Sequence, residues 1–198
     1  MKVIIDNGHG IDTKGKRSPI WTDGSQLFEW EFNRDIANRL LTMLNDEGIS
    51  SFLVVPENKD ISLKERVKRI NNFYRNNPNS FLLSIHANAG GGTGWEIFTS
   101  KGETRSDAIA ECFVESARIH LQQFRIRKDL LDGDSDKEAN FYILKHTRCP
   151  AVLTENLFMD TKKDCRFMMS ESGRDAITKL HFDGVLKVNM NLYDFINI

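Results

Sequence analysis

Three residues that can bind a metal or move a proton lie at, or a few residues beyond, the end of a short apolar segment. They are His9, His86 and Glu155. Imidazole and carboxylate groups hold catalytic zinc in proteins, and they also transfer protons near neutral pH. Residues this far apart in the chain form a site only if the fold brings them together. Whether they do so depends on the strands and helices that position them.

The segments that precede these residues are typical of buried strands. Residues 3–5, 81–85 and 151–154 are short apolar runs bounded by polar or turn-forming residues. Residues 29–47 and 62–74 instead have apolar side chains at helical spacing. Strands that alternate with helices predict an α/β fold with a largely parallel sheet. Sites in such folds form beyond the carboxyl ends of the strands, so we expect the three residues to converge there.

The rest of the chain continues this alternation. Further strands are predicted at residues 52–55 and 95–99, helices at 107–123, 161–169 and 172–192, a helical turn at 142–146, and loops at 11–27 and 125–139. Ser62 and Glu65 have the spacing of a capping box for the second helix. The sequence contains no repeat, linker or low-complexity tract, so we predict a single domain covering residues 1–198.

The residues at the strand ends match the needs of a catalytic zinc site. Such a site has about three protein ligands, commonly two histidines and a carboxylate, and keeps one position open. His9 and His86 supply the imidazoles, and Glu29 or Glu31 supplies the carboxylate. Glu155 then remains to move a proton. The alternative is that the first histidine is an ordinary loop residue and the second a core histidine.

The other residues of interest have less specific interpretations. The remaining histidines are His120, His146 and His181. The first lies in a helical pattern and the other two near predicted helix surfaces, so we expect structural or solvent-facing roles. The tryptophans are Trp21, Trp30 and Trp95. A tryptophan exposed near a cleft can stack on a sugar ring, and packing in the core or at its rim is the alternative.

Composition argues against several classes of protein. The net charge of −1 and the dispersed basic residues argue against a nucleic-acid binder, and we interpret residues 125–128 as a solvated loop or helix end. The three cysteines include no CxxC pair, so neither a disulfide framework nor a cysteine zinc site is expected. No stretch approaches the roughly 18 apolar residues that span a membrane.

Four segments together resemble the zinc-dependent N-acetylmuramoyl-L-alanine amidases of the amidase-3 type. Residues 6–10 read D-N-G-H-G and resemble the family's D-P-G-H-G, residues 29–37 resemble E-x-x-x-N-x-x-I-A, residues 84–88 match S-I-H-A-N, and residues 150–155 match P-A-V-L-x-E. Their order and spacing agree with the family over most of the chain. Two departures are Asn7, where the family has proline, and residues 156–160, where a Gly-Phe version is commoner.

The resemblance implies a site and a reaction. It places zinc on His9, Glu29 and His86, which selects Glu29 over Glu31, and it makes Glu155 the catalytic carboxylate. The reaction implied is hydrolysis of the amide between the lactyl group of N-acetylmuramic acid and L-alanine of the peptidoglycan stem peptide. The fold implied is a single-domain, three-layer α/β fold with a mixed, mostly parallel sheet of about six strands flanked by helices.

Two alternatives and a cellular location complete the predictions. A zinc carboxypeptidase or endopeptidase acting on stem peptides would use the same side chains, and a catalytically silent wall-binding module would lack some of them. We expect a monomer whose partner is peptidoglycan, with no nucleic acid and no membrane span. No signal peptide is recognisable, so we expect synthesis in the cytoplasm and action on the cell wall after release, as in phage lysins more than in resident autolysins.

Overall fold

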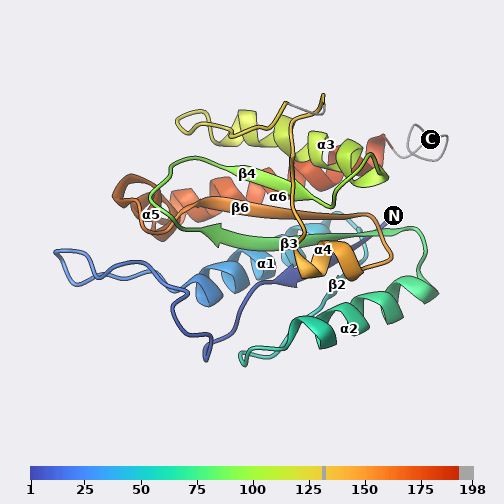
Figure 1. Ribbon diagram of the computed structural model, residues 1–198, viewed down its shortest axis with the longest axis horizontal. Coiled ribbons are helices and arrows are strands. Elements are labelled where there is room, and N and C mark those ends of the chain that lie inside the picture. The colour runs from blue at the N-terminus through green and yellow to red at the C-terminus, as the bar shows by residue number, and fades with distance from the viewer. Residues whose placement is uncertain (131–132, 192–198) are drawn as a thin grey trace.

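The computed structural model describes residues 1–130 and 133–191, which are organised around one six-stranded sheet (Figure 1). The strands are β1 (Lys2–Asn7), β2 (Ser51–Leu53), β3 (Ser80–Asn88), β4 (Glu96–Thr99), β5 (Lys137–Glu138) and β6 (Ala151–Phe158). Their order across the sheet is β2-β1-β3-β6-β4-β5. Only β4 and β6 pair antiparallel, and the other neighbours pair parallel. The sheet is therefore mixed and mostly parallel, as predicted.

Helices cover both faces of the sheet and complete three layers. They are α1 (Glu29–Asp46), α2 (Leu63–Asn76), α3 (Arg105–His120), α4 (Tyr142–His146), α5 (Lys162–Met169) and α6 (Glu171–Met190). In Figure 1, α4 lies in front of the sheet and α6 lies behind β4 and β6, with α3 along the top of the view and α2 along the bottom. The larger apolar cluster joins one face of the sheet to α1, α3, α5 and α6, and the smaller cluster joins the other face to α2 and α4. This confirms the predicted three-layer fold.

The central strands are apolar along their length because both of their faces are buried. Ile5 and Leu83 belong to the larger cluster, whereas Ile4 and Leu82 belong to the smaller one. Successive side chains of a strand point to opposite faces. His86 lies an even number of residues beyond Leu82, so it emerges on the face that α2 and α4 cover. The site is therefore on that face, at the carboxyl end of β3.

Several predicted boundaries were wrong in instructive ways. The predicted helix 107–123 begins at Arg105, because Thr104 caps it in a capping box with Asp107, and it ends at His120. The predicted loop 125–139 contains the short strand β5, which carries no apolar pattern and lies at the edge of the sheet. The predicted end of the last helix, residue 192, lies outside the described residues. At α2, the Ser62 side chain accepts a hydrogen bond from Glu65 N, as the capping-box spacing predicted.

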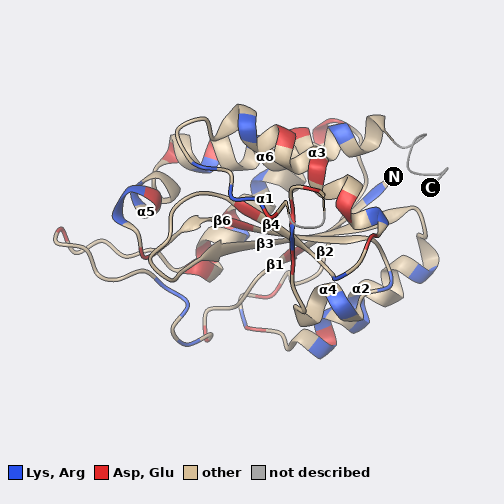
Figure 2. Ribbon diagram, turned by 45° about the horizontal axis from the view of Figure 1, so that its top comes forward, with Lys and Arg blue, Asp and Glu red and all other residues tan. Residues whose placement is uncertain are grey.

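Charged residues of both signs are interspersed on the outer helices. In the view of Figure 2, Lys and Arg alternate with Asp and Glu along α3, α5 and α6. This distribution agrees with the net charge of −1 for the whole sequence. None of the described helices combines the length and apolar character that crossing a membrane requires.

His181 lies in the core, and its predicted position near a helix surface was wrong. The side chain is fully buried on α6, where Nδ1 lies 2.7 Å from Ile177 O and Nε2 lies 2.9 Å from Thr154 Oγ1. A carbonyl oxygen only accepts, so Nδ1 carries the hydrogen and the neutral ring accepts from the threonine hydroxyl. Burial lowers the pKa of His181 to about 4.

We expect acid to destabilise the folded chain through His181. The unfolded histidine, with its ordinary pKa of 6.5, binds a proton below that pH, whereas the folded chain excludes this proton until about pH 4. Because the unfolded state binds more protons in this window, the free energy of unfolding should fall by about 3 kcal/mol as the pH is lowered through it. Urea unfolding at a series of pH values measures this slope.

Two histidine variants separate this effect from the general acid sensitivity of the protein. His181→Gln should flatten the slope, because the substituted side chain does not titrate. His146→Gln is the matched control, since His146 is exposed on α4 and should leave the slope as it is in the wild type. An unchanged slope in His181→Gln would show that other groups cause the loss of stability.

Candidate metal centre and catalytic carboxylate

His9 lies in a tight turn directly after β1, and the surrounding side chains fix its backbone. Its φ of 65° lies in the left-handed region, which costs energy for any residue other than glycine. Two arginines hold its carbonyl oxygen: Arg34 Nη1 donates at 2.8 Å and Arg66 Nη2 at 3.2 Å. Asn33 Nδ2 donates to Gly8 O at 3.1 Å. The turn is therefore anchored to α1 and α2, which offsets the cost of its conformation.

The first glycine of the Asn-Gly-His-Gly turn is needed for space. A Cβ atom on Gly8 would lie 2.2 Å from His86 Cε1, so the imidazole of His86 packs directly on the backbone of the turn. Asn7, where the amidase family usually has proline, donates from Nδ2 to Val55 O at 3.0 Å and ties β1 to the segment after β2.

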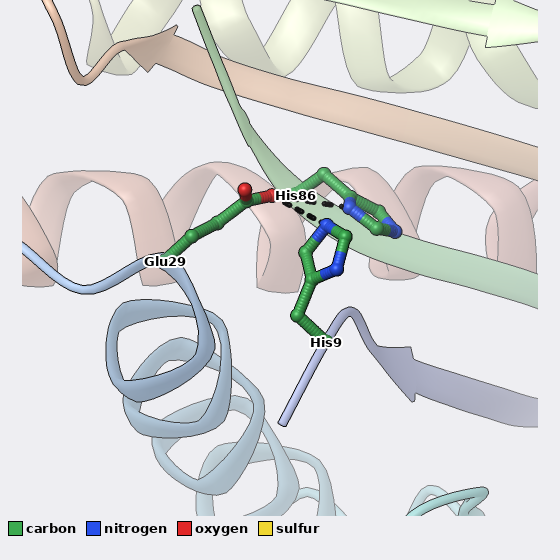
Figure 3. A group of neighbouring side chains, drawn as sticks. All are labelled: His9, Glu29 and His86. Carbon is green, nitrogen blue, oxygen red and sulfur yellow. Dashed lines mark hydrogen bonds and ion pairs between the residues drawn. The ribbon is translucent and has the colours of Figure 1, made fainter. Parts of the chain in front are cut away.

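Glu29 is the carboxylate that meets both histidines (Figure 3). Its Oε1 lies 3.3 Å from His9 Nε2 and 3.2 Å from His86 Nδ1, and Ala87 N donates to the same oxygen. The ligand atoms of the three side chains all lie within 4.8 Å of one another. Glu29 is 1% exposed, whereas Glu31 is 56% exposed and lies beside Arg174. The structure therefore favours Glu29 over Glu31 as the partner of the histidines.

The polar atoms of this group fit a bound cation. Within the described part of the chain, Glu29 Oε2 is buried without a hydrogen-bond partner and has only an ion-pair contact with Lys16 Nζ at 3.8 Å. His9 Nε2 likewise has only its ion-pair contact with Glu29. Burial acts to raise the pKa of Glu29, but hydrogen bonds to His86 and His9 outweigh it and hold that pKa well below its usual range. The group therefore joins an ionised carboxylate to two imidazoles, which is a donor set suited to zinc.

Glu155 lies beside this group on the adjacent strand. Its Cα is the register partner of His86 between the parallel strands β3 and β6, so both side chains share one face of the sheet. Its Oε2 is buried and has no hydrogen-bond partner among the residues described. Burial raises the pKa of Glu155 to about 7, and the negative charge of Glu29 also raises it. A carboxyl group that titrates near neutrality can both accept and donate a proton.

A second buried carboxylate, which the sequence analysis did not identify, lies next to Glu155. Glu96 on β4 is the antiparallel partner of Glu155, and its carboxylate forms ion pairs with Arg127 and Lys137. Arg127 therefore does not belong to a merely solvated run, as the interpretation of residues 125–128 implied. Asn88 Nδ2 donates to Glu96 Oε1 at 2.6 Å, so its side chain is also engaged here. The spacing of Asn88, Glu96, Arg127 and Lys137 in the sequence follows no helical or strand period. Only the folded structure therefore shows that they are neighbours.

A small cavity adjoins the histidines on the side of α2. Its volume is about 260 Å³, and its lining includes His9, His86, Asp60, Leu63 and Ile143. The two imidazoles, the charged side chains of Asp6, Asp60 and Arg66, and the apolar side chains of Leu63 and Ile143 all contribute to its lining. Space for part of a ligand thus lies on the side of the histidines away from β4.

The remaining candidates have structural roles. His120 Nε2 lies 2.6 Å from Asp183 Oδ2, and the ring of His146 packs against Tyr142. Trp95 is fully buried and donates from Nε1 to Asn156 Oδ1, so the packing alternative was right for this tryptophan. Trp21 and Trp30 are partly exposed. The three cysteines, Cys112, Cys149 and Cys165, are buried and free.

Two imidazoles and a carboxylate around one point, with a second carboxylate beside them, are the side chains of a metal-dependent hydrolase. The family model of N-acetylmuramoyl-L-alanine amidases (Amidase_3) matches residues 3–187, and the chain belongs to this family. This membership confirms the resemblance drawn from the four sequence segments.

Individual relatives agree with the family. The chain is 31% identical to the sporulation-specific N-acetylmuramoyl-L-alanine amidase of Bacillus subtilis (strain 168), over 93% of this chain and 67% of that protein. It is 28% identical to the N-acetylmuramoyl-L-alanine amidase CwlM of Bacillus licheniformis, over 94% and 68%. The crystal structure of N-acetylmuramoyl-L-alanine amidase from Clostridium difficile 630 superposes with a TM-score of 0.78 at 26% identity, covering 95% of this chain and 96% of that chain.

Proposed function

We propose that residues 1–198 form one catalytic unit that hydrolyses the amide between the lactyl group of N-acetylmuramic acid and L-alanine of the peptidoglycan stem peptide. In this proposal, His9, Glu29 and His86 hold Zn²⁺, and Glu155 moves the proton. The observation that carries it is the meeting of the three ligand atoms within 4.8 Å, with Glu155 on the adjacent strand. The family match and the names of the relatives support the choice of bond.

The three ligand residues prepare a site of the required charge. Glu29 stays ionised at neutral pH because the histidines stabilise its negative charge. The backbone N–H of Ala87 fixes the position of Oε1, and the arginines on His9 O fix the imidazole that follows β1. Zinc bound here would supply a positive charge that polarises the scissile carbonyl and makes water more acidic.

Glu155 is suited to carry the proton from water to the leaving group. With a pKa of about 7, it accepts a proton from the attacking water at little cost and can give it to the amine of L-alanine as the carbon–nitrogen bond breaks. Its position beside His86 puts the carboxylate within one strand spacing of the ligand group. Water loses the proton, the amine gains it, and Glu155 returns to its starting state.

The substrate places this reaction at the cell wall. All four groups come from one chain, which supports a monomer as the active form. Size-exclusion chromatography with light scattering tests this point. The chain would meet peptidoglycan after release from the cytoplasm.

We expect zinc-dependent release of intact stem peptides from purified peptidoglycan. Mass spectrometry should identify peptides that begin with free L-alanine. A chelator should abolish their release, and added zinc should restore it, because the ligand set is two imidazoles and a carboxylate. Shortened peptides still attached to sugar would instead identify a zinc peptidase. Binding to the wall without any product would identify a silent module.

A further inference from the structure

A row of polar residues crosses the sheet and continues past the proposed metal ligands. His86 on β3 pairs with Glu155 on β6, which pairs in turn with Glu96 on β4. Paired residues of neighbouring strands point to the same face. Glu155 therefore lies between the proposed metal site on one side and Glu96 on the other. Any substrate group that passes Glu155 away from the metal approaches Glu96 and its partners.

Glu96 organises a small cationic cluster, which we call the Glu96 cluster. It consists of Asn88, Glu96, Arg127 and Lys137. The carboxylate of Glu96 is buried and accepts hydrogen bonds from Arg127 Nε at 2.7 Å, from Lys137 Nζ and from Asn88 Nδ2 at 2.6 Å. Two cations on one carboxylate leave the cluster with one net positive charge. A positive charge held in place attracts an anionic ligand.

Arg127 presents the part of this cluster that a ligand can reach. Only its Nε contacts Glu96, and both Nη atoms are without a hydrogen-bond partner among the described residues. The guanidinium lies over the ring of Phe158, 5.1 Å from its centroid, and a third of the side chain is exposed. The ring and Glu96 together fix its orientation. A planar guanidinium whose two Nη groups are both free is suited to bind a carboxylate through two hydrogen bonds.

The charges of the proposed substrate indicate which side of the scissile bond would bind to this positive charge. The carboxyl group of the lactyl ether is consumed in the scissile amide, so the N-acetylmuramic acid side of that bond carries no charge. Carboxylates remain on the stem peptide, which is the leaving group. We propose that Arg127, oriented by Glu96 and supported by Lys137, binds a carboxylate of the stem peptide. This inference rests on the proposed function, and it orients the peptide past Glu155 toward β4.

A set of soluble substrates tests the inference on the wild-type protein with zinc. The substrates are N-acetylmuramoyl tripeptides with both carboxylates free, with only that of the second residue amidated, with only the terminal one amidated, and with both amidated. Amidation of the recognised carboxylate should lower kcat/KM by about 10- to 100-fold, mainly through KM, because it removes a charge-assisted hydrogen bond. The singly amidated substrate whose kcat/KM falls identifies the carboxylate that the protein recognises.

Equal kcat/KM for all four substrates would overturn the inference and leave the proposed amidase activity intact. No cleavage of any substrate, together with no release of peptides from intact peptidoglycan, would overturn the proposed function and the inference with it. The wild-type series requires no variant, so it decides the question even if substitutions in the cluster impair folding.

Variants then test whether Arg127 is the group responsible. Arg127→Gln should abolish the preference for the free carboxylate, so that kcat/KM no longer differs between the free and the amidated substrates. Arg127→Lys should restore part of the preference, because it keeps the charge without the planar fork. Lys128→Gln is the matched control: it removes one positive charge from the same segment, but Lys128 donates to Ser135 and not to Glu96. A full carboxylate preference in Arg127→Gln would overturn the assignment.

Discussion

Glu155→Gln should abolish turnover and leave zinc bound. A glutamine has nearly the same shape as the glutamate it replaces, but it cannot accept a proton from water or return one to the leaving amine. We expect kcat to fall by about 10³-fold, within the range attributed to general acid–base catalysis. Release of L-alanyl peptides from a soluble muramoyl peptide gives kcat, and elemental analysis of the purified protein gives the zinc content.

Matched controls make this result specific. Glu31→Gln removes a negative charge from α1 near the same site, but Glu31 is 56% exposed and does not meet the histidines, so its activity should stay near that of the wild type. Glu29→Gln removes a proposed ligand and should lose both zinc and activity. If Glu155→Gln lost zinc to the same extent as Glu29→Gln, Glu155 would be a ligand and its assigned role in proton transfer would be wrong.

The convergence of the site could be predicted because it follows from the architecture. The predicted strands before His9, His86 and Glu155 are all parallel, and the carboxyl ends of parallel strands lie at one edge of the sheet. The choice of Glu29 over Glu31 was different. Spacing alone left both open, because either can precede or begin a helix, and only the family resemblance selected Glu29.

The Glu96 cluster could not be predicted, because its contacts arise only in the folded chain. Glu96, Arg127 and Lys137 are distant in sequence, and the segments that hold two of them have no apolar period. Edge strands with polar side chains look like loops, which is why β5 was missed. Charge pairing across a sheet leaves no periodic signal in one sequence.

The sequence contained a signal for the burial of His181 that was overlooked. Ile177, His181, Gly184 and Val188 recur at helical spacing, and all four are buried on α6. The position of the histidine on this stripe predicted burial, whereas its polarity suggested the surface. At Gly184 the packing against α3 is so close that a Cβ would lie 2.5 Å from Phe113. Position on the helix therefore outweighed residue type, since the neutral ring finds two partners inside.

Arg66→Met should weaken both the fold and the metal site. The guanidinium of Arg66 is 2% exposed and pairs with Asp6 at 2.7 Å. It also donates to the carbonyl oxygens of Asn7, His9 and Ile61. Removing it leaves the buried carboxylate of Asp6 without its cation, and we expect the free energy of unfolding to fall by about 3–5 kcal/mol. Urea unfolding measures the loss.

The nearby Arg69 provides the control for this substitution. It lies one turn along α2 and pairs with Glu57, but both side chains are partly exposed. Arg69→Met should therefore cost no more than about 1 kcal/mol. A loss of stability in Arg66→Met as small as in Arg69→Met would show that the buried pair with Asp6 has no special weight.

A double substitution separates the charge of Arg66 from its contact with the turn. Asp6→Asn in the Arg66→Met background removes the unpaired carboxylate, so much of the lost stability should return.

The affinity for zinc should behave differently from the stability. His9 O still lacks one of its two arginine donors in the double variant, so we expect zinc to bind about 10- to 100-fold more weakly in both the single and the double variant, as happens when groups that orient metal ligands are removed. Zinc binding to the folded protein, followed by calorimetry, measures this. Recovery of stability together with zinc affinity would mean that Arg66 acts only through its charge, whereas recovery of stability alone would show that the buried arginine holds His9 in its left-handed turn for the metal.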